Sequence, residues 1–171
     1  MFKKILLLFL LISLTAISLL ILPKLIKSQI KYKNAQYPGP LPVVNISPLP
    51  VISINSLKIP VLIADTPEKQ RQGLSNTSFL PEDHGMLFIY KEKVSPYFWM
   101  IQMKYPIDII WIADNEVVDI SFEVPNPNSD TPPSELPKYH PPRPVNYVLE
   151  VNAGFAKRHD IKVGDPVEIK P

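Results

Sequence analysis

The sequence predicts a mainly β protein: a compact β-sandwich or barrel-like domain with one or two short helices, behind an N-terminal transmembrane helix. Three observations lead to this prediction. Residues 5–22 are apolar and uncharged, residues 28–53 are rich in proline, and short apolar runs bounded by turn residues fill the rest of the chain. We therefore expect a membrane anchor or uncleaved signal at residues 1–27, a linker at 28–53 and a β-rich globular domain at 54–171.

The N-terminal apolar run, Ile5 to Leu22, contains eighteen residues without a charge. As a helix it would span about 27 Å, close to the ~30 Å hydrocarbon core of a bilayer. Lys3 and Lys4 also fit a signal peptide, but the end of the run lacks the small residues of a cleavage site. We expect a single-pass anchor with the globular domain on the extracytoplasmic side. The lysines after Pro23 favour the opposite orientation, which stays open.

The linker carries repeated prolines, which fix φ and remove backbone hydrogen-bond donors. Such a stretch favours an extended, semi-rigid spacer. Its prolines are Pro38, Pro40, Pro42, Pro48 and Pro50.

Short strands and two short helices are expected within the domain. Thr66 and Pro67 indicate a helix start and Gly73 its end, while Asp114-Asn115 indicates a tight hairpin. A second short helix is expected at residues 153–159. The expected strands cover residues 57–64, 86–90, 97–103, 107–113, 116–122, 146–151 and 166–169.

A long proline-rich loop is expected between Val124 and Pro144. Loops of this length are uncommon in compact domains and are usually functional or disordered.

Composition excludes several classes of function. The formal net charge of +2 lies largely beside the apolar run, so a clustered basic face for nucleic acid is not expected. The basic residues there are expected to contact lipid headgroups. The chain has no cysteine, which excludes disulfides and thiolate metal sites. No phosphate-binding glycine loop or dinucleotide fingerprint is present, and we expect no metal and no cofactor.

Five blocks of the domain resemble domain-of-unknown-function family 192, in order and in spacing, over about residues 58–168. They are ADTPEKQRQGLS, LPEDHGMLFIY, FWM, PIDIIWI and VLEVNAGFAKRHDIKVGD. The resemblance implies a compact β-sandwich with small helices, often behind a signal or an anchor, and no established activity. Ile101, Gln102 and Met103 stand where the family usually carries a lysine, an asparagine and a threonine. Any role of that lysine is therefore not expected here.

The candidate binding residues begin with a polar and aromatic group around residues 98–111. Trp99 and Gln102 lie near Asp108 in the sequence, and an aromatic beside a carboxylate and an amide is typical of a saccharide or small-ligand site. Core packing of the aromatics, Trp111 among them, is the alternative. Asp108 lies in an apolar strand, so if buried it needs a partner, and Arg71 is the candidate. A purely structural Arg71–Asp108 pair is equally compatible with the sequence.

Three further residues complete the candidate set. Asp83 and His84 could form a general base, although a solvated loop histidine explains them as well. Asn152 could cap the second helix, or belong to an anion site at its start. Met86, Met100 and Met103 could form a thioether copper site, but core packing explains them better because strand spacing puts Met100 and Met103 on opposite faces.

These observations favour a membrane-tethered binding or interaction module for an envelope saccharide, another small ligand or a protein partner. No catalytic residue is assigned. One alternative is an enzyme acting on an envelope substrate through Asp83, His84 or Asp108 with Arg71. A structural accessory subunit of a membrane complex is the other.

Overall fold

The computed structural model describes residues 49–170. The predicted anchor at residues 1–27 and most of the predicted linker lie outside the described residues. Among residues 49–170, no helix has the length and apolarity that crossing a membrane requires.

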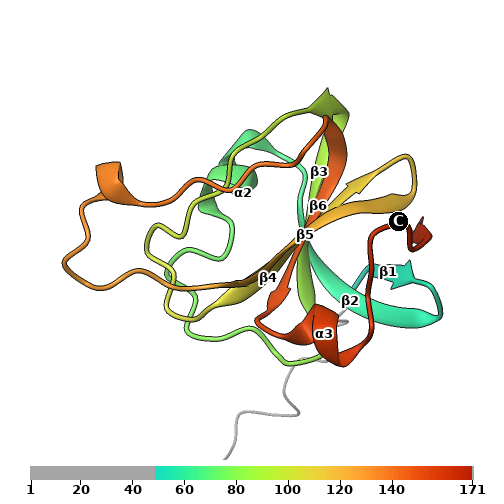
Figure 1. Ribbon diagram of the computed structural model, residues 1–171, viewed down its shortest axis with the longest axis horizontal. Coiled ribbons are helices and arrows are strands. Elements are labelled where there is room, and N and C mark those ends of the chain that lie inside the picture. Colours follow the sequence, from blue (N-terminus) through green and yellow to red (C-terminus); the bar gives the residue numbers. More distant parts are fainter. Residues whose placement is uncertain (1–48, 171) are drawn as a thin grey trace, which may run out of the picture. The chain divides into compact units, whose positions relative to one another are not determined.

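Seven strands form one sheet in the order β5-β4-β6-β3-β2-β1-β7 (Figure 1). Neighbouring strands are antiparallel, except for the parallel pair β2 and β3. Within residues 49–170, two short α-helices and one 3₁₀ turn accompany the sheet. The strands are β1 (Val51–Ile54), β2 (Leu57–Ala64), β3 (Gly85–Val94), β4 (Ile107–Ala113), β5 (Glu116–Val124), β6 (Val145–Asn152) and β7 (Val167–Lys170); the helices are α2 (Pro67–Gln72), η1 (Pro133–Glu135) and α3 (Phe155–Arg158).

The sheet curls into a half-barrel because its two outermost strands meet at one end. Val117 N donates to Asp165 O at 3.0 Å, and Val167 N donates to Asn115 O at 2.7 Å. These bonds connect the start of β5 to the start of β7. The mainly β prediction with two short helices is therefore confirmed, whereas the described residues form one curled sheet in place of the two stacked sheets of a sandwich.

Apolar clusters cover both faces of this sheet. The first core draws residues from all seven strands and from α3, including Ile110 and Ile112 of β4. The second core lies on the opposite face and includes Ile109 and Trp111 of β4. Because successive side chains of a strand point to opposite faces, every residue of β4 is buried.

The first helix and the hairpin form where the local sequence predicted them. The Thr66 side chain accepts a hydrogen bond from Lys69 N at 3.3 Å, and Gly73 ends α2 with φ +47°. Asp114 and Asn115 both have positive φ, 54° and 62°, as a tight hairpin turn between β4 and β5 requires.

One predicted boundary and one predicted strand are wrong. Strand β1 begins at Val51, where the prediction had placed the linker and started the domain at residue 54. Residues 97–103 form no strand; Met103 N donates to Met100 O at 3.1 Å in a turn with Gln102 at φ +57°. The turn brings Met100 and Met103 into the same second core, so they do not face opposite sides.

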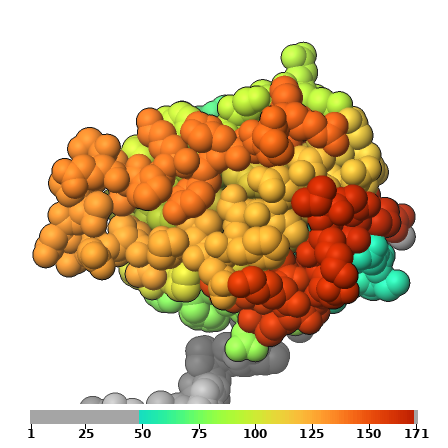
Figure 2. Space-filling model, in the orientation of Figure 1, coloured from blue at the N-terminus to red at the C-terminus, as the bar shows by residue number. Residues whose placement is uncertain are grey.

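The long loop after β5 is held against the domain by backbone hydrogen bonds. Phe98 N donates to Tyr139 O at 2.9 Å, and Tyr139 N donates to Phe98 O at 2.8 Å. Figure 2 shows this loop, in orange, packed along one side of the domain and extending beyond it. The loop thus fixes the segment at residues 97–103 from outside.

Candidate functional site

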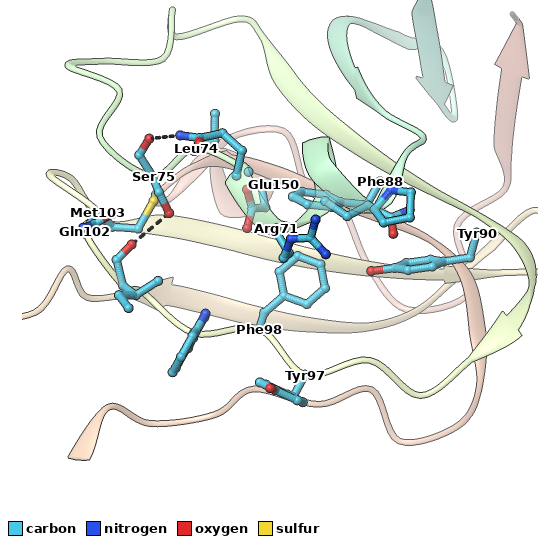
Figure 3. A pocket seen from close by; sticks show the side chains of 16 residues that line it. Arg71, Leu74, Ser75, Phe88, Tyr90, Tyr97, Phe98, Gln102, Met103 and Glu150 are labelled. Atoms are coloured by element: carbon cyan, nitrogen blue, oxygen red, sulfur yellow. Dashed lines mark hydrogen bonds between the residues drawn. The ribbon is translucent and has the colours of Figure 1, made fainter. Parts of the chain in front are cut away.

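A pocket of about 640 Å³ opens on the second-core side of the sheet, beside α2 and the turn at residues 100–103 (Figure 3). Its walls combine aromatic rings with a few polar side chains, which is the usual make-up of a small-molecule site. The lining residues that carry the site are Arg71, Tyr90, Phe98, Trp99, Gln102 and Glu150.

Glu150 supplies the buried polar group of the pocket. It lies in β6, with Met86 of β3 on one side and Ile109 of β4 on the other. Its side chain is 6% exposed, and its Oε2 is buried without a hydrogen-bond partner among the described residues. Burial raises the pKa of this carboxyl to about 8, because an apolar surrounding disfavours the charged form.

Tyr90 of the neighbouring strand β3 lines the same pocket as Glu150. Burial raises the pKa of Tyr90 to about 12, and the negative charge of Glu150 adds to the effect. Figure 3 shows the hydroxyl of Tyr90 directed toward the middle of the pocket lining. The phenol is therefore a neutral group that can donate or accept a hydrogen bond at physiological pH.

The rim of the pocket holds three of the predicted residues. Arg71 on α2 is 73% exposed and its Nη2 lies 3.5 Å from Glu68 Oε1, so its guanidinium remains open to solvent and to the pocket. Trp99 is 38% exposed. Gln102 holds the turn by accepting a hydrogen bond from Asn76 Nδ2 at 2.8 Å.

Asp108 lies on the opposite face from the pocket, and its predicted pairing with Arg71 is wrong. Its carboxylate accepts from Glu123 N at 2.7 Å, Gly154 N at 3.1 Å and Ala156 N at 2.9 Å. The first of these N–H groups lies where the β4–β5 register shifts, and the other two start α3. Asp108 is thus a buried structural acid whose partners are backbone amides.

Trp111 is a core residue, as the packing alternative predicted. It is fully buried, its ring lies edge-on to Phe98 at 5.5 Å, and its Nε1 donates to Ser121 Oγ at 3.1 Å. Trp111 therefore supports the pocket wall from behind Phe98 without lining the pocket.

The prediction that Asn152 caps the second helix is wrong. The cap position is Gly154, which has no side chain, and Asp108 binds the free N–H groups from a different strand. Asn152 Nδ2 instead donates to Leu80 O at 2.9 Å and Pro81 O at 3.1 Å. Its role is to fasten the segment between α2 and β3 to the sheet.

Asp83 and His84 lie outside the pocket lining, at the start of β3. His84 Nδ1 lies 2.6 Å from Asp83 Oδ1, and this hydrogen bond lowers the pKa of the exposed Asp83 carboxyl. Within residues 49–170 no three His, Asp or Glu side chains are placed to hold a metal ion.

Glu150 was missed by the sequence analysis, although a signal was present. It is a lone acid in the apolar run Val148–Val151, as Asp108 is in Ile107–Ile110. The same reasoning that selected Asp108 would have selected Glu150, because a buried acid needs either a partner or a function.

Two solved structures and one family model are similar to this chain. A protein of unknown function from Novosphingobium aromaticivorans has a similar structure, with TM-score 0.61 and 29% identity over 78% of this chain and 94% of the other. A candidate transcription regulator from Sinorhizobium meliloti has TM-score 0.62 and 28% identity over 72% and 96% of the two chains. No curated protein matches the chain. The sequence model of DUF192, uncharacterized ACR, matches residues 51–169, and the chain belongs to this family.

Proposed function

We propose that the domain is a binding module for a small ligand that occupies the pocket around Glu150. The observation that carries this proposal is the buried Glu150 oxygen, which has no hydrogen-bond partner among the described residues. Buried polar groups in folded proteins are almost always hydrogen-bonded, and an unsatisfied one costs about 1–3 kcal/mol. A ligand that supplies the missing partner would remove this cost on binding.

The pocket also has the dimensions and walls of a ligand site. Its volume of about 640 Å³ lies within the roughly 300–1,000 Å³ typical of small-molecule pockets. Trp99 offers an exposed ring at the rim, and Arg71 offers a solvent-exposed guanidinium whose ion pair is with Glu68. We propose that a saccharide or another small polar ligand of the cell envelope binds here, with the domain held near the membrane by the N-terminal apolar run.

An enzyme is the second candidate, because a carboxyl with a raised pKa beside a tyrosine can act as a general acid. Glu150 is the sole carboxylate among the residues that line the pocket. Glycoside hydrolysis normally uses two carboxylates. We therefore rank binding above catalysis, and any catalysis here would rely on one proton-transferring group.

Thermal-shift screening of the full chain in detergent tests the binding proposal. Saccharides, amines, carboxylic acids and nucleotides form the screen, since a ligand at 100 times its Kd stabilises by about 2.7 kcal/mol. We expect a hit whose shift is lost in Trp99→Ala and Arg71→Ala. Phe122→Ala and Arg143→Ala are matched controls, because both residues are exposed and lie outside the pocket lining.

The controls should keep the shift. A screen without a hit, or hits that survive both pocket substitutions, would count against the pocket as the binding site.

A further inference from the structure

The geometry points to a ligand that carries a protonated amine, with its N–H groups bound by the Glu150 carboxylate. This inference rests on the proposed binding function and names the chemical class of the ligand. It starts from Glu150 because this acid has no cationic partner among residues 49–170.

The charges of the pocket leave Glu150 free for a ligand. Arg71 is the other charged residue of the lining, and the ion pair that it forms is with Glu68. A primary ammonium carries three N–H donors and a positive charge, and it supplies both the hydrogen bond and the countercharge that Glu150 lacks. Hydrogen bonds between ionised partners are roughly twice as strong as neutral ones.

The aromatic walls favour the same class of ligand. Phe88 and Phe98 line the pocket and meet edge-to-face, with ring centroids 4.8 Å apart. Aromatic faces attract cations, and a nearby ring of the lining already does so: Lys138 Nζ lies 4.8 Å from the centre of Tyr97. An ammonium ligand would thus meet a carboxylate and π faces in one cavity.

Ionisation of Glu150 gives this proposal a signature that neutral ligands lack. An ammonium binds the charged carboxylate, so it must displace the proton that burial retains on Glu150. The titratable groups that feel the Glu150 charge are Tyr90 and Tyr105, whose pKa values are raised mainly by burial, and Arg71 shares its pocket. Arginine stays charged and these tyrosines stay neutral between pH 6 and 8, so Glu150 is the one of these groups that titrates there.

Calorimetric titration of the full chain with 2-phenylethylamine, and with uncharged 2-phenylethanol as its counterpart, tests the proposal. From pH 6 to pH 8, amine affinity should rise about 50-fold as the ionised fraction of Glu150 grows, with proton release at pH 6 seen by comparing two buffers. Alcohol affinity should stay constant. Glu150→Gln should weaken amine binding at pH 8 at least about tenfold and abolish its pH dependence. The control Glu68→Gln, at an exposed position, should keep the wild-type amine affinity and its pH dependence.

Equal binding of amine and alcohol, or amine binding independent of pH, would overturn the inference without reliance on any variant. Amine binding retained by a folded Glu150→Gln protein would overturn it as well. If a saccharide or an acid from the screen instead binds in a manner sensitive to Trp99→Ala, the amine class is wrong and the pocket proposal stands. If nothing binds the pocket, both fail.

Discussion

Replacing Glu150 with glutamine should make the protein more stable at alkaline pH, because glutamine has nearly the same shape and never ionises. Burial raises the pKa of Glu150 from 4.5 to about 8. The stability associated with this raised pKa is fully present below about pH 4.5 and is lost as the pH rises through about 8. At 1.36 kcal/mol per pKa unit, the wild-type protein should lose on the order of 4 kcal/mol relative to Glu150→Gln between pH 5 and pH 9. This is a large part of a typical stability of about 5–15 kcal/mol.

Urea unfolding of both proteins at pH 5, 6, 7, 8 and 9 measures this difference. The two unfolding free energies should be similar at pH 5 and should diverge steadily above it. Glu68→Gln is the control, because Glu68 is exposed and its pKa is lowered by backbone and Thr66 hydrogen bonds, so it is already ionised across this range. A constant difference between wild type and Glu150→Gln from pH 5 to pH 9 would show that Glu150 is not the buried, proton-retaining group described here.

Three further predictions separate structural from binding residues. Asp108→Asn should lower the free energy of unfolding by about 2–4 kcal/mol, because an amide NH₂ would face backbone N–H groups such as that of Ala156; urea unfolding measures it, and exposed Asp130→Asn should change little. Asn152→Ala should cost about 1–2 kcal/mol and speed hydrogen exchange between α2 and β3; unchanged exchange would refute its fastening role. Arg71→Ala should alter stability by less than about 1 kcal/mol, since its ion pair is exposed; a larger loss in thermal unfolding would make it structural.

The parts of the fold that depend on neighbouring residues were predictable from sequence. Thr66 and Gly73 bound a helix through bonds within a single turn, and Asp114-Asn115 forms a hairpin through its own backbone preference. The turn at Gln102 was missed because it places a residue other than glycine or asparagine at positive φ. Strand β1 was missed because prolines precede it, although its partner β2 follows after a two-residue turn; its other partner, β7, lies at the far end of the domain sequence.

The single curled sheet was also beyond local reasoning. The choice between a sandwich and a barrel-like sheet depends on whether β5 meets β7, and these strands are connected through bonds such as Val167 N to Asn115 O. Seven short strands separated by turns satisfy either arrangement locally. A sandwich and a single curled sheet differ only in how the first and last strands of the sheet are arranged, which short sequence windows do not show.

The candidate site was predicted in part, and one of its errors was avoidable. Arg71, Trp99 and Gln102 do meet at one pocket. Asp108 and Trp111 are three residues apart in a strand, so their side chains point to opposite faces and could not share a site. Once residues 107–113 are predicted as a strand, the alternation of side chains therefore shows from sequence alone that Asp108 and Trp111 lie on different faces.

Asp108 and Glu150 give the same sequence signal and have opposite physical roles. Each is a buried acid within an apolar strand, one on each face of the sheet. Asp108 accepts three backbone N–H groups, whereas Glu150 has an oxygen that no described residue satisfies. Neutral amides at the two positions should therefore act in opposite directions at pH 8: Asp108→Asn lowers the free energy of unfolding, and Glu150→Gln raises it. If both substitutions moved stability the same way, hydrogen-bond satisfaction would not distinguish the structural acid from the one that faces a ligand.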